Sequence, residues 1–112
     1  MNKYQDVQPI NRNDAEKLLA TNDVEKITTT LVSISFYEKD WKWVQDKCLE
    51  YLFHSDDVIS GLAATCLGHV ARINRKMEKK KVIALLNSRL SNLQIAGKIE
   101  DAINDIDMYI EN

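Results

Sequence analysis

Glycine and proline are scarce in this sequence, with three glycines and one proline in 112 residues. A β-sandwich or β-barrel would need a turn signal about every 8–12 residues, and glycine and proline are the usual turn formers. The common residues are instead leucine, isoleucine, alanine, lysine, glutamate and aspartate, a mixture typical of helical proteins. With 45% hydrophobic residues the chain can build one core. We therefore expect a single all-α domain over residues 1–112.

Long apolar runs are absent as well. A helix that crosses a bilayer needs about eighteen or more consecutive apolar residues, and the sequence contains no such stretch. The first residues, MNKYQDVQPINRND, lack the apolar centre of a secretory signal. We therefore expect a cytoplasmic protein without membrane contact.

Residues that carry catalysis or hold metals are few and isolated. Cys48 and Cys66 lie on different predicted helices and lack CxxC spacing, so we expect both thiols in the core. His54 and His69 have no second ligand at a spacing that zinc requires. Nucleophile motifs and phosphate-binding loops are also missing. The sequence therefore predicts no enzymatic activity, no cofactor and no metal.

Hydrophobic periodicity and capping residues predict six helices. The expected segments are 15–22, a second carrying Val24 to Ile34, 41–53, 57–72, 77–91 and 94–110. The expected caps of the first four helices are, in order, Asn13 or Asp14, Asn22 or Asp23, Asp40, and Ser55 or Asp56. Connections this short join antiparallel neighbours, so three antiparallel pairs are expected. The expected core comprises Trp41, Cys48, Leu52, Ala63, Cys66, Leu67, Val70, Ile99, Ile103 and Ile106.

The fourth and sixth predicted helices match at an offset of 36 residues. The superposed positions are Ile59 on Ile95, Gly61 on Gly97, Ala63 on Ile99, Cys66 on Ala102, Leu67 on Ile103 and Val70 on Ile106. A glycine inside a helix costs about 1 kcal/mol relative to alanine. Two glycines at one phase therefore predict close packing against a neighbouring backbone. Gly61, Ala64 and Gly68 would form the small-residue stripe of the fourth helix.

The motif D-x-V-x-x-x-A-A-x-x-L-G-x-V resembles the second helix of a HEAT repeat. Here it is carried by Asp56 to Val58, Ala63-Ala64, Leu67-Gly68 and Val70, and IEDAINDI, at 99–106, resembles a degenerate copy. The resemblance implies a short right-handed α–α superhelix, with residues 1–12 as a loosely ordered N-terminal segment. A general α–α superhelix is the alternative, because the first pair is short and the usual proline is missing.

Solenoids bind macromolecules along the face formed by their second helices. The same offset predicts three rows on that face: Thr29, Thr65 and Asp101; Ser33, His69 and Asp105; and Tyr37, Arg72 and Met108. A merely solvated face is the alternative for any one of these residues.

Charge is distributed in blocks although the net charge is only −2. Residues 1–71 carry 7 basic and 11 acidic side chains, residues 72–98 carry 8 and 1, and residues 99–112 carry 0 and 5. The basic run RINRKMEKKK, at 72–81, could bind nucleic acid, but no aromatic side chain for base stacking interrupts it. The acidic last helix favours a basic protein partner.

A small acidic-faced helical protein without catalytic residues resembles the HEAT-like bacterial immunity proteins of contact-dependent growth inhibition systems. The resemblance implies a monomer that binds a cognate toxin, expected to be a basic nuclease domain, and covers its active site or substrate groove. The alternatives are a HEAT-like adaptor or regulatory module and a nucleic-acid binder that uses the basic run. The candidate partner-binding residues are Tyr37, Trp43, Asp56, Asp57, His69, Arg72, Asp101, Asp105, Met108 and Tyr109.

Overall fold

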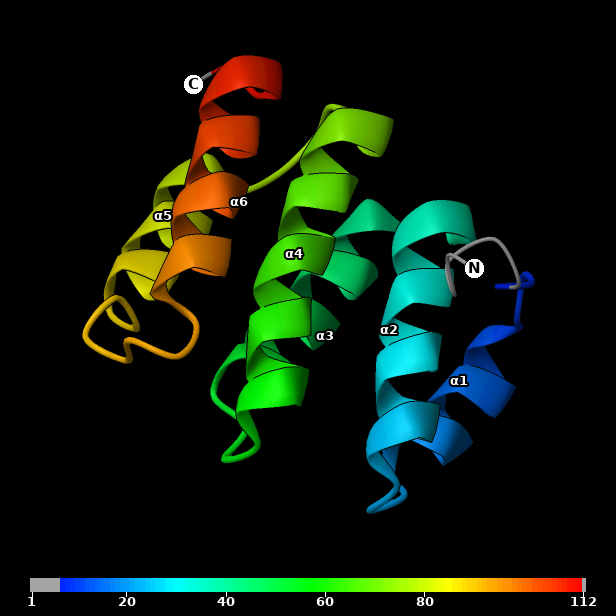
Figure 1. Cartoon of the computed structure of the whole chain (residues 1–112). Coiled ribbons are helices and arrows are strands. Elements are labelled where there is room, and N and C mark those ends of the chain that lie inside the picture. Colours follow the sequence, from blue (N-terminus) through cyan, green and yellow to red (C-terminus); the bar gives the residue numbers. More distant parts are fainter. Residues whose placement is uncertain (1–6, 112) are drawn as a thin grey trace.

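The computed structural model describes residues 7–111, which form six α-helices and no strand (Figure 1). The helices are α1 (Arg12–Leu19), α2 (Val24–Tyr37), α3 (Trp41–Leu52), α4 (Asp57–Asn74), α5 (Lys79–Asn87) and α6 (Ala96–Tyr109). The predicted all-α fold is confirmed.

The helices form two layers. α2, α4 and α6 lie side by side and run in the same direction, and α1, α3 and α5 lie behind them (Figure 1). The connections α1–α2, α3–α4 and α5–α6 consequently lie at one end of the molecule, the lower end in Figure 1. The end formed by the last turns of α2, α4 and α6 is the upper end. These two names are kept below.

Side-chain caps account for the starts of the first four helices. Asp23, Asp40 and Asp56 each accept a backbone N–H of the following turn, so these predicted caps are confirmed. The prediction for α1 is wrong, because Asn11 rather than Asn13 or Asp14 is the cap, and it accepts the N–H of Asp14 at 2.8 Å.

The last pair of helices is shorter than predicted. α5 begins only at Lys79, because the N–H of Glu78 is bound by the Gln45 side chain. The Asn92 side chain accepts the N–H of Gln94 at 3.0 Å and so forms a turn in place of the first predicted residues of α6. The connection between α5 and α6 is therefore longer than the sequence indicates.

α4 is the central helix, with α2, α3 and α6 packed around it. Most of the expected core is confirmed: Cys48, Leu52, Ala63, Cys66, Leu67, Val70, Ile99 and Ile106 are buried. Trp41 and Ile103 were expected in the core and are only half-buried. Trp41 is the first residue of α3, and Ile103 lies on α6, whose neighbours among the described helices are α4 and α5.

The two cysteines meet across α3 and α4. Both are fully buried, as predicted. A hydrogen bond with Cys66 and complete burial raise the pKa of the Cys48 thiol well above its usual value. Both side chains thus act as small core residues.

The paired-glycine prediction is right for α4 and wrong for α6. A Cβ on Gly61 would lie 3.3 Å from the Ile95 Cγ2 atom and 2.8 Å from the Lys98 Cδ atom, and a Cβ on Gly68 would lie 2.8 Å from an Asp105 oxygen. At Gly97 no atom would lie within 4 Å. The reason is positional, because Gly61 faces Ile95 and Lys98 at the start of α6, whereas no described atom lies opposite Gly97.

Replacing Gly61 by leucine is expected to lower the free energy of unfolding by about 1–3 kcal/mol, since a branched side chain has no room between α4 and α6. Gly97→Leu is the matched control, because its site is open and leucine has the better helix propensity. Thermal or urea unfolding measures both variants. Equal stabilities would show that the α4–α6 contact does not require a small residue.

Candidate functional site

The ten candidate partner-binding residues do not form one surface. Tyr37, Arg72, Met108 and Tyr109 lie at the upper end, whereas Asp56, Asp57 and Asp101 lie toward the lower end. His69 and Asp105 lie between the two ends, and Trp43 belongs to α3 in the other layer. The second-helix face is therefore divided into two chemically different ends.

His69, Arg72 and Asp105 interact with one another. The Arg72 guanidinium contacts Nδ1 of His69, and its Nε atom lies 3.8 Å from an Asp105 oxygen. The His69 ring is only 9% exposed and lies 4.8 Å from the Phe36 ring, centroid to centroid. Burial, and secondly the positive charge of Arg72, lower the pKa of His69 to about 4. His69 is therefore a neutral, interior side chain near pH 7.

The three aromatic candidates differ in their exposure. Tyr37 is 49% exposed, and its hydroxyl donates to the Val7 carbonyl at 3.3 Å. Trp43 is half-buried, with the Arg12 guanidinium carbon 4.5 Å from its ring centroid, and the Arg75 guanidinium covers Tyr109 at 4.8 Å. These cation–π contacts already use one ring face of Trp43 and one of Tyr109.

An N-terminal strap, residues 7–10, covers part of α2. Val7 is buried, and Ser33 donates a hydrogen bond to the Gln8 carbonyl. The expectation that Ser33 belongs to an exposed row is therefore wrong, because the strap occupies its place. The segment expected to be loosely ordered comprises residues 1–12. Its residues 1–6 lie outside the described residues, whereas Asn11 caps α1 and Arg12 is the first residue of that helix.

The basic run and the acidic last helix pair with each other. Besides the Arg72–Asp105 pair, Lys79 lies 3.4 Å from Asp107 and donates to the Ile110 carbonyl at 3.1 Å. Lys81 lies 3.7 Å from Glu78. The two charged blocks therefore partly neutralise each other, and several of the cations that a nucleic-acid site would need are already engaged.

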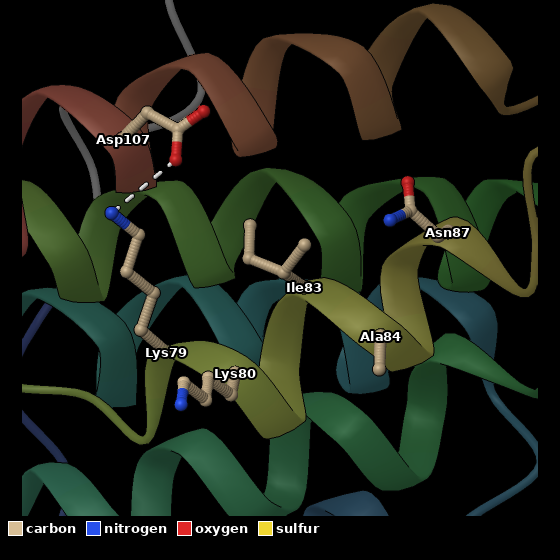
Figure 2. A pocket seen from close by; sticks show the side chains of 6 residues that line it. All are labelled: Lys79, Lys80, Ile83, Ala84, Asn87 and Asp107. Carbon is tan, nitrogen blue, oxygen red and sulfur yellow. Dashed lines mark ion pairs between the residues drawn. The ribbon is translucent and has the colours of Figure 1, made fainter. Parts of the chain in front are cut away.

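An open groove of about 780 Å³ lies between α5 and α6 (Figure 2). Its lining comprises Lys79, Lys80, Ile83, Ala84, Asn87 and Asp107. Figure 2 shows Lys79 and Asp107 facing each other across this groove. The mixed lining includes both charge signs and a small apolar floor.

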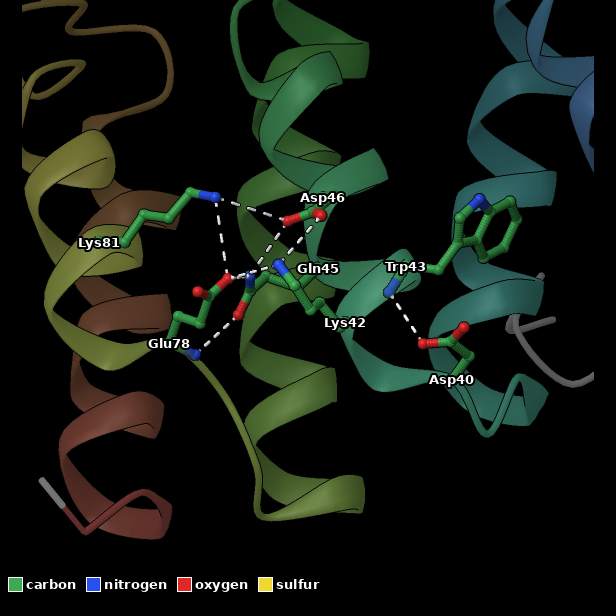
Figure 3. Close-up of polar contacts among 7 residues, drawn as sticks. All are labelled: Asp40, Lys42, Trp43, Gln45, Asp46, Glu78 and Lys81. Carbon is green, nitrogen blue, oxygen red and sulfur yellow. Dashed lines mark hydrogen bonds and ion pairs between the residues drawn. The ribbon is translucent and has the colours of Figure 1, made fainter.

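A buried glutamine fastens α5 to α3, which the sequence reading missed. The Oε1 atom of Gln45 accepts the Glu78 N–H at 2.8 Å, and its Nε2 atom donates to the Glu78 carboxylate at 2.7 Å (Figure 3). Lys42 reaches the same carboxylate at 3.0 Å. The hydrogen bonds that Glu78 accepts from Lys42 and then from Gln45 lower the pKa of Glu78, and the hydrogen bond that Lys42 donates to Glu78 raises the pKa of Lys42. The sequence signal that could have revealed this contact is that Gln45, a polar residue, lies on the helix face that the apolar residues of α3 share.

Arg89 is a second residue that the sequence reading missed. Its Nε atom donates to the Leu52 carbonyl at 3.1 Å, and its Nη2 atom donates to the Ser60 hydroxyl at 3.2 Å. The side chain therefore satisfies a carbonyl at the C-terminal end of α3. No sequence pattern indicates this contact, because it joins residues 37 positions apart.

Within residues 7–111, no group of three or more His, Cys, Asp or Glu side chains is placed to hold a metal ion. None of the helices described is both long and apolar enough to cross a membrane.

Comparison with solved structures shows what the fold resembles. The chain is similar to a chain of a CDI complex. That crystal structure, from Cupriavidus taiwanensis LMG 19424, matches with a TM-score of 0.85 and 27% sequence identity, over 92% of this chain and 93% of the other. Neither the protein-family models nor the curated proteins include a match.

Proposed function

We propose that the protein is the immunity component of a toxin–immunity pair of the contact-dependent growth inhibition type. The single observation that carries the proposal is the likeness to a chain of a CDI complex, which extends over almost the full length of both chains. The immunity-protein resemblance noted in the sequence is independent support. In this role the protein binds its cognate toxin in the bacterial cytoplasm and blocks it without chemistry of its own.

The toxin is proposed to be a basic nuclease domain whose active site or substrate groove is covered. Carboxylates on the immunity protein would take the positions that nucleic-acid phosphates occupy in the free toxin. Among the described residues Glu100 and Asp101 form no ion pair and are exposed, so their charges are available to a partner. The HEAT-like superhelix is proposed as the scaffold that presents them.

Coexpression with the toxin domain that the proposal expects to be encoded next to this chain's gene tests the proposal. The expected result is survival of cells that contain both proteins, death of cells that contain the toxin alone, and a 1:1 complex in solution. Wild-type protein that neither protects nor binds would overturn the proposal. Nuclease assays of the purified domain, with and without the immunity protein, test the nature of the toxin separately.

Reversing Asp101 and Asp105 to lysine is expected to slow association with the toxin domain at low salt and to have less effect at high salt, where charges are screened. Asp101 is exposed, and the pair that Asp105 forms with Arg72 is partly exposed, so the fold should be retained. Stopped-flow kinetics at several salt concentrations measure the effect. An unchanged rate that does not depend on salt would contradict the electrostatic part of the proposal.

A further inference from the structure

Apolar side chains are exposed at each connection of the lower end. Val24 begins α2, Phe53 directly follows α3, Val58 lies in the first turn of α4, and Leu93 lies between α5 and α6. Val58 is 62% exposed and Leu93 is 84% exposed. Figure 1 shows that all three connections lie at this end. These four residues are called the apolar end below.

The apolar end is held by hydrogen bonds between its connections. The Asn92 amide donates to Asp57 at 3.0 Å, so the neighbours of Leu93 and Val58 in the chain are joined directly. Tyr51 donates to the Leu19 carbonyl at 2.9 Å and joins the end of α3 to the end of α1. The exposed apolar groups are therefore presented on a braced surface, which reduces the ordering cost of binding.

Carboxylates surround the apolar end. Asp23 and Glu25 lie beside Val24, Asp56 and Asp57 beside Val58, and Glu100 and Asp101 in the first turns of α6. None of these six forms an ion pair with another described residue, in contrast to Asp105 and Asp107 farther along α6. The cations near this end are Lys17, Lys26, Lys98 and Arg89, whose guanidinium carbon lies 5.7 Å from the Phe53 ring centroid. Six unpaired carboxylates against four cations leave negative charge in excess.

From this arrangement we infer that the apolar end is the surface on which the toxin docks, with a basic partner surface around an apolar centre. The inference rests on the proposed function and names the site that the proposed function leaves open. Protein interfaces commonly combine a desolvated apolar centre with a charged rim. The carboxylates favour a basic partner by charge complementarity. Val58 and Leu93 supply the apolar surface that the partner covers.

The upper end carries charges of both signs. Its exposed apolar residues are Tyr37, Ile73 and Met108. Arg72, Arg75 and Lys76 lie at the end of α4 there, and the Tyr37 hydroxyl is bound to the strap. These cations alternate with carboxylates of α6, and Arg72 pairs with Asp105 there, so the upper end lacks the rim of unpaired carboxylates that the lower end has.

Two matched double variants test the inference against the purified toxin domain encoded next to this chain's gene. Val58→Ser with Leu93→Ser removes apolar surface from the lower end, and Ile73→Ser with Met108→Ser removes it from the upper end. All four side chains are exposed, so both variants should melt like wild type. We expect the lower-end variant to raise Kd about tenfold or more through faster dissociation, and the upper-end variant to bind like wild type.

The possible results separate the two proposals. Weakened binding by the lower-end variant alone supports the inference. Weakened binding by the upper-end variant, or equal Kd values for both variants and wild type, overturns the inference and leaves the proposed function intact. A wild-type protein that does not bind the toxin domain overturns both.

Discussion

Gln45→Met is expected to lower the free energy of unfolding by about 2–3 kcal/mol, because it leaves a buried hydrogen-bond network incomplete. Methionine has a similar shape but can neither accept the Glu78 N–H nor donate to its carboxylate. Gln45 is fully buried, so the Glu78 N–H that it accepts is left facing the methionine side chain. The Glu78 carboxylate, on a side chain that is 40% exposed, keeps its pair with Lys42. The start of α5, which has no side-chain cap of its own, loses its attachment to α3.

Lys42→Met is the matched control for this substitution. Lys42 binds the same Glu78 carboxylate, but its side chain is more than half exposed, and exposed ion pairs contribute little to stability. We therefore expect a much smaller change in urea unfolding than for Gln45→Met. Similar losses for both variants would show that the charge on Glu78, rather than the buried amide, attaches α5.

The stability of the protein is expected to fall between about pH 7 and pH 4 because of His69. Its pKa is lowered from 6.5 to about 4 in the folded state, so the unfolded chain binds more protons in this range. Protonation then favours unfolding, and the contribution at neutral pH is lost as the pH decreases. The shift corresponds to a loss of roughly 2 kcal/mol by about pH 5.

His69→Gln removes the titrating group and tests this dependence. Urea unfolding from about pH 7 to pH 5 should give a smaller decrease in stability for the variant than for wild type. This pH range lies above the range in which Glu16, Asp40 and Glu78 become protonated. Their lowered pKa values cause a further loss of stability only at more acidic pH. A variant with the wild-type pH dependence would show that His69 is not the responsible group.

The sequence predicts the helices well because their signals are local. Asp23, Asp40 and Asp56 each cap a helix within three residues of their own position, and apolar periodicity identifies the faces that α4 and α6 bury. Helix ends that depend on distant partners were missed. The start of α5 is decided by Gln45, which lies 33 residues earlier in the chain.

The candidate site was less predictable because burial and ion pairing depend on the register between helices. The distribution of charge along the sequence indicated the acidic and basic blocks, but it could not show that Arg72 and Lys79 pair with carboxylates of α6. Likewise, the helical phase that places His69 on a surface row takes no account of the Phe36 ring packed against it. Val58 and Leu93 were not singled out, since their exposure follows from the way the connections fold.

The central position of α4 limits how this fold can change in length. A long solenoid can gain or lose whole repeats, because each repeat contacts only its neighbours. Here one helix contacts α2, α3 and α6 and buries residues from Ile59 to Ala71 against them. Deleting either α1 and α2 or α5 and α6 would uncover one side of α4, so the described helices depend on one another through this single helix.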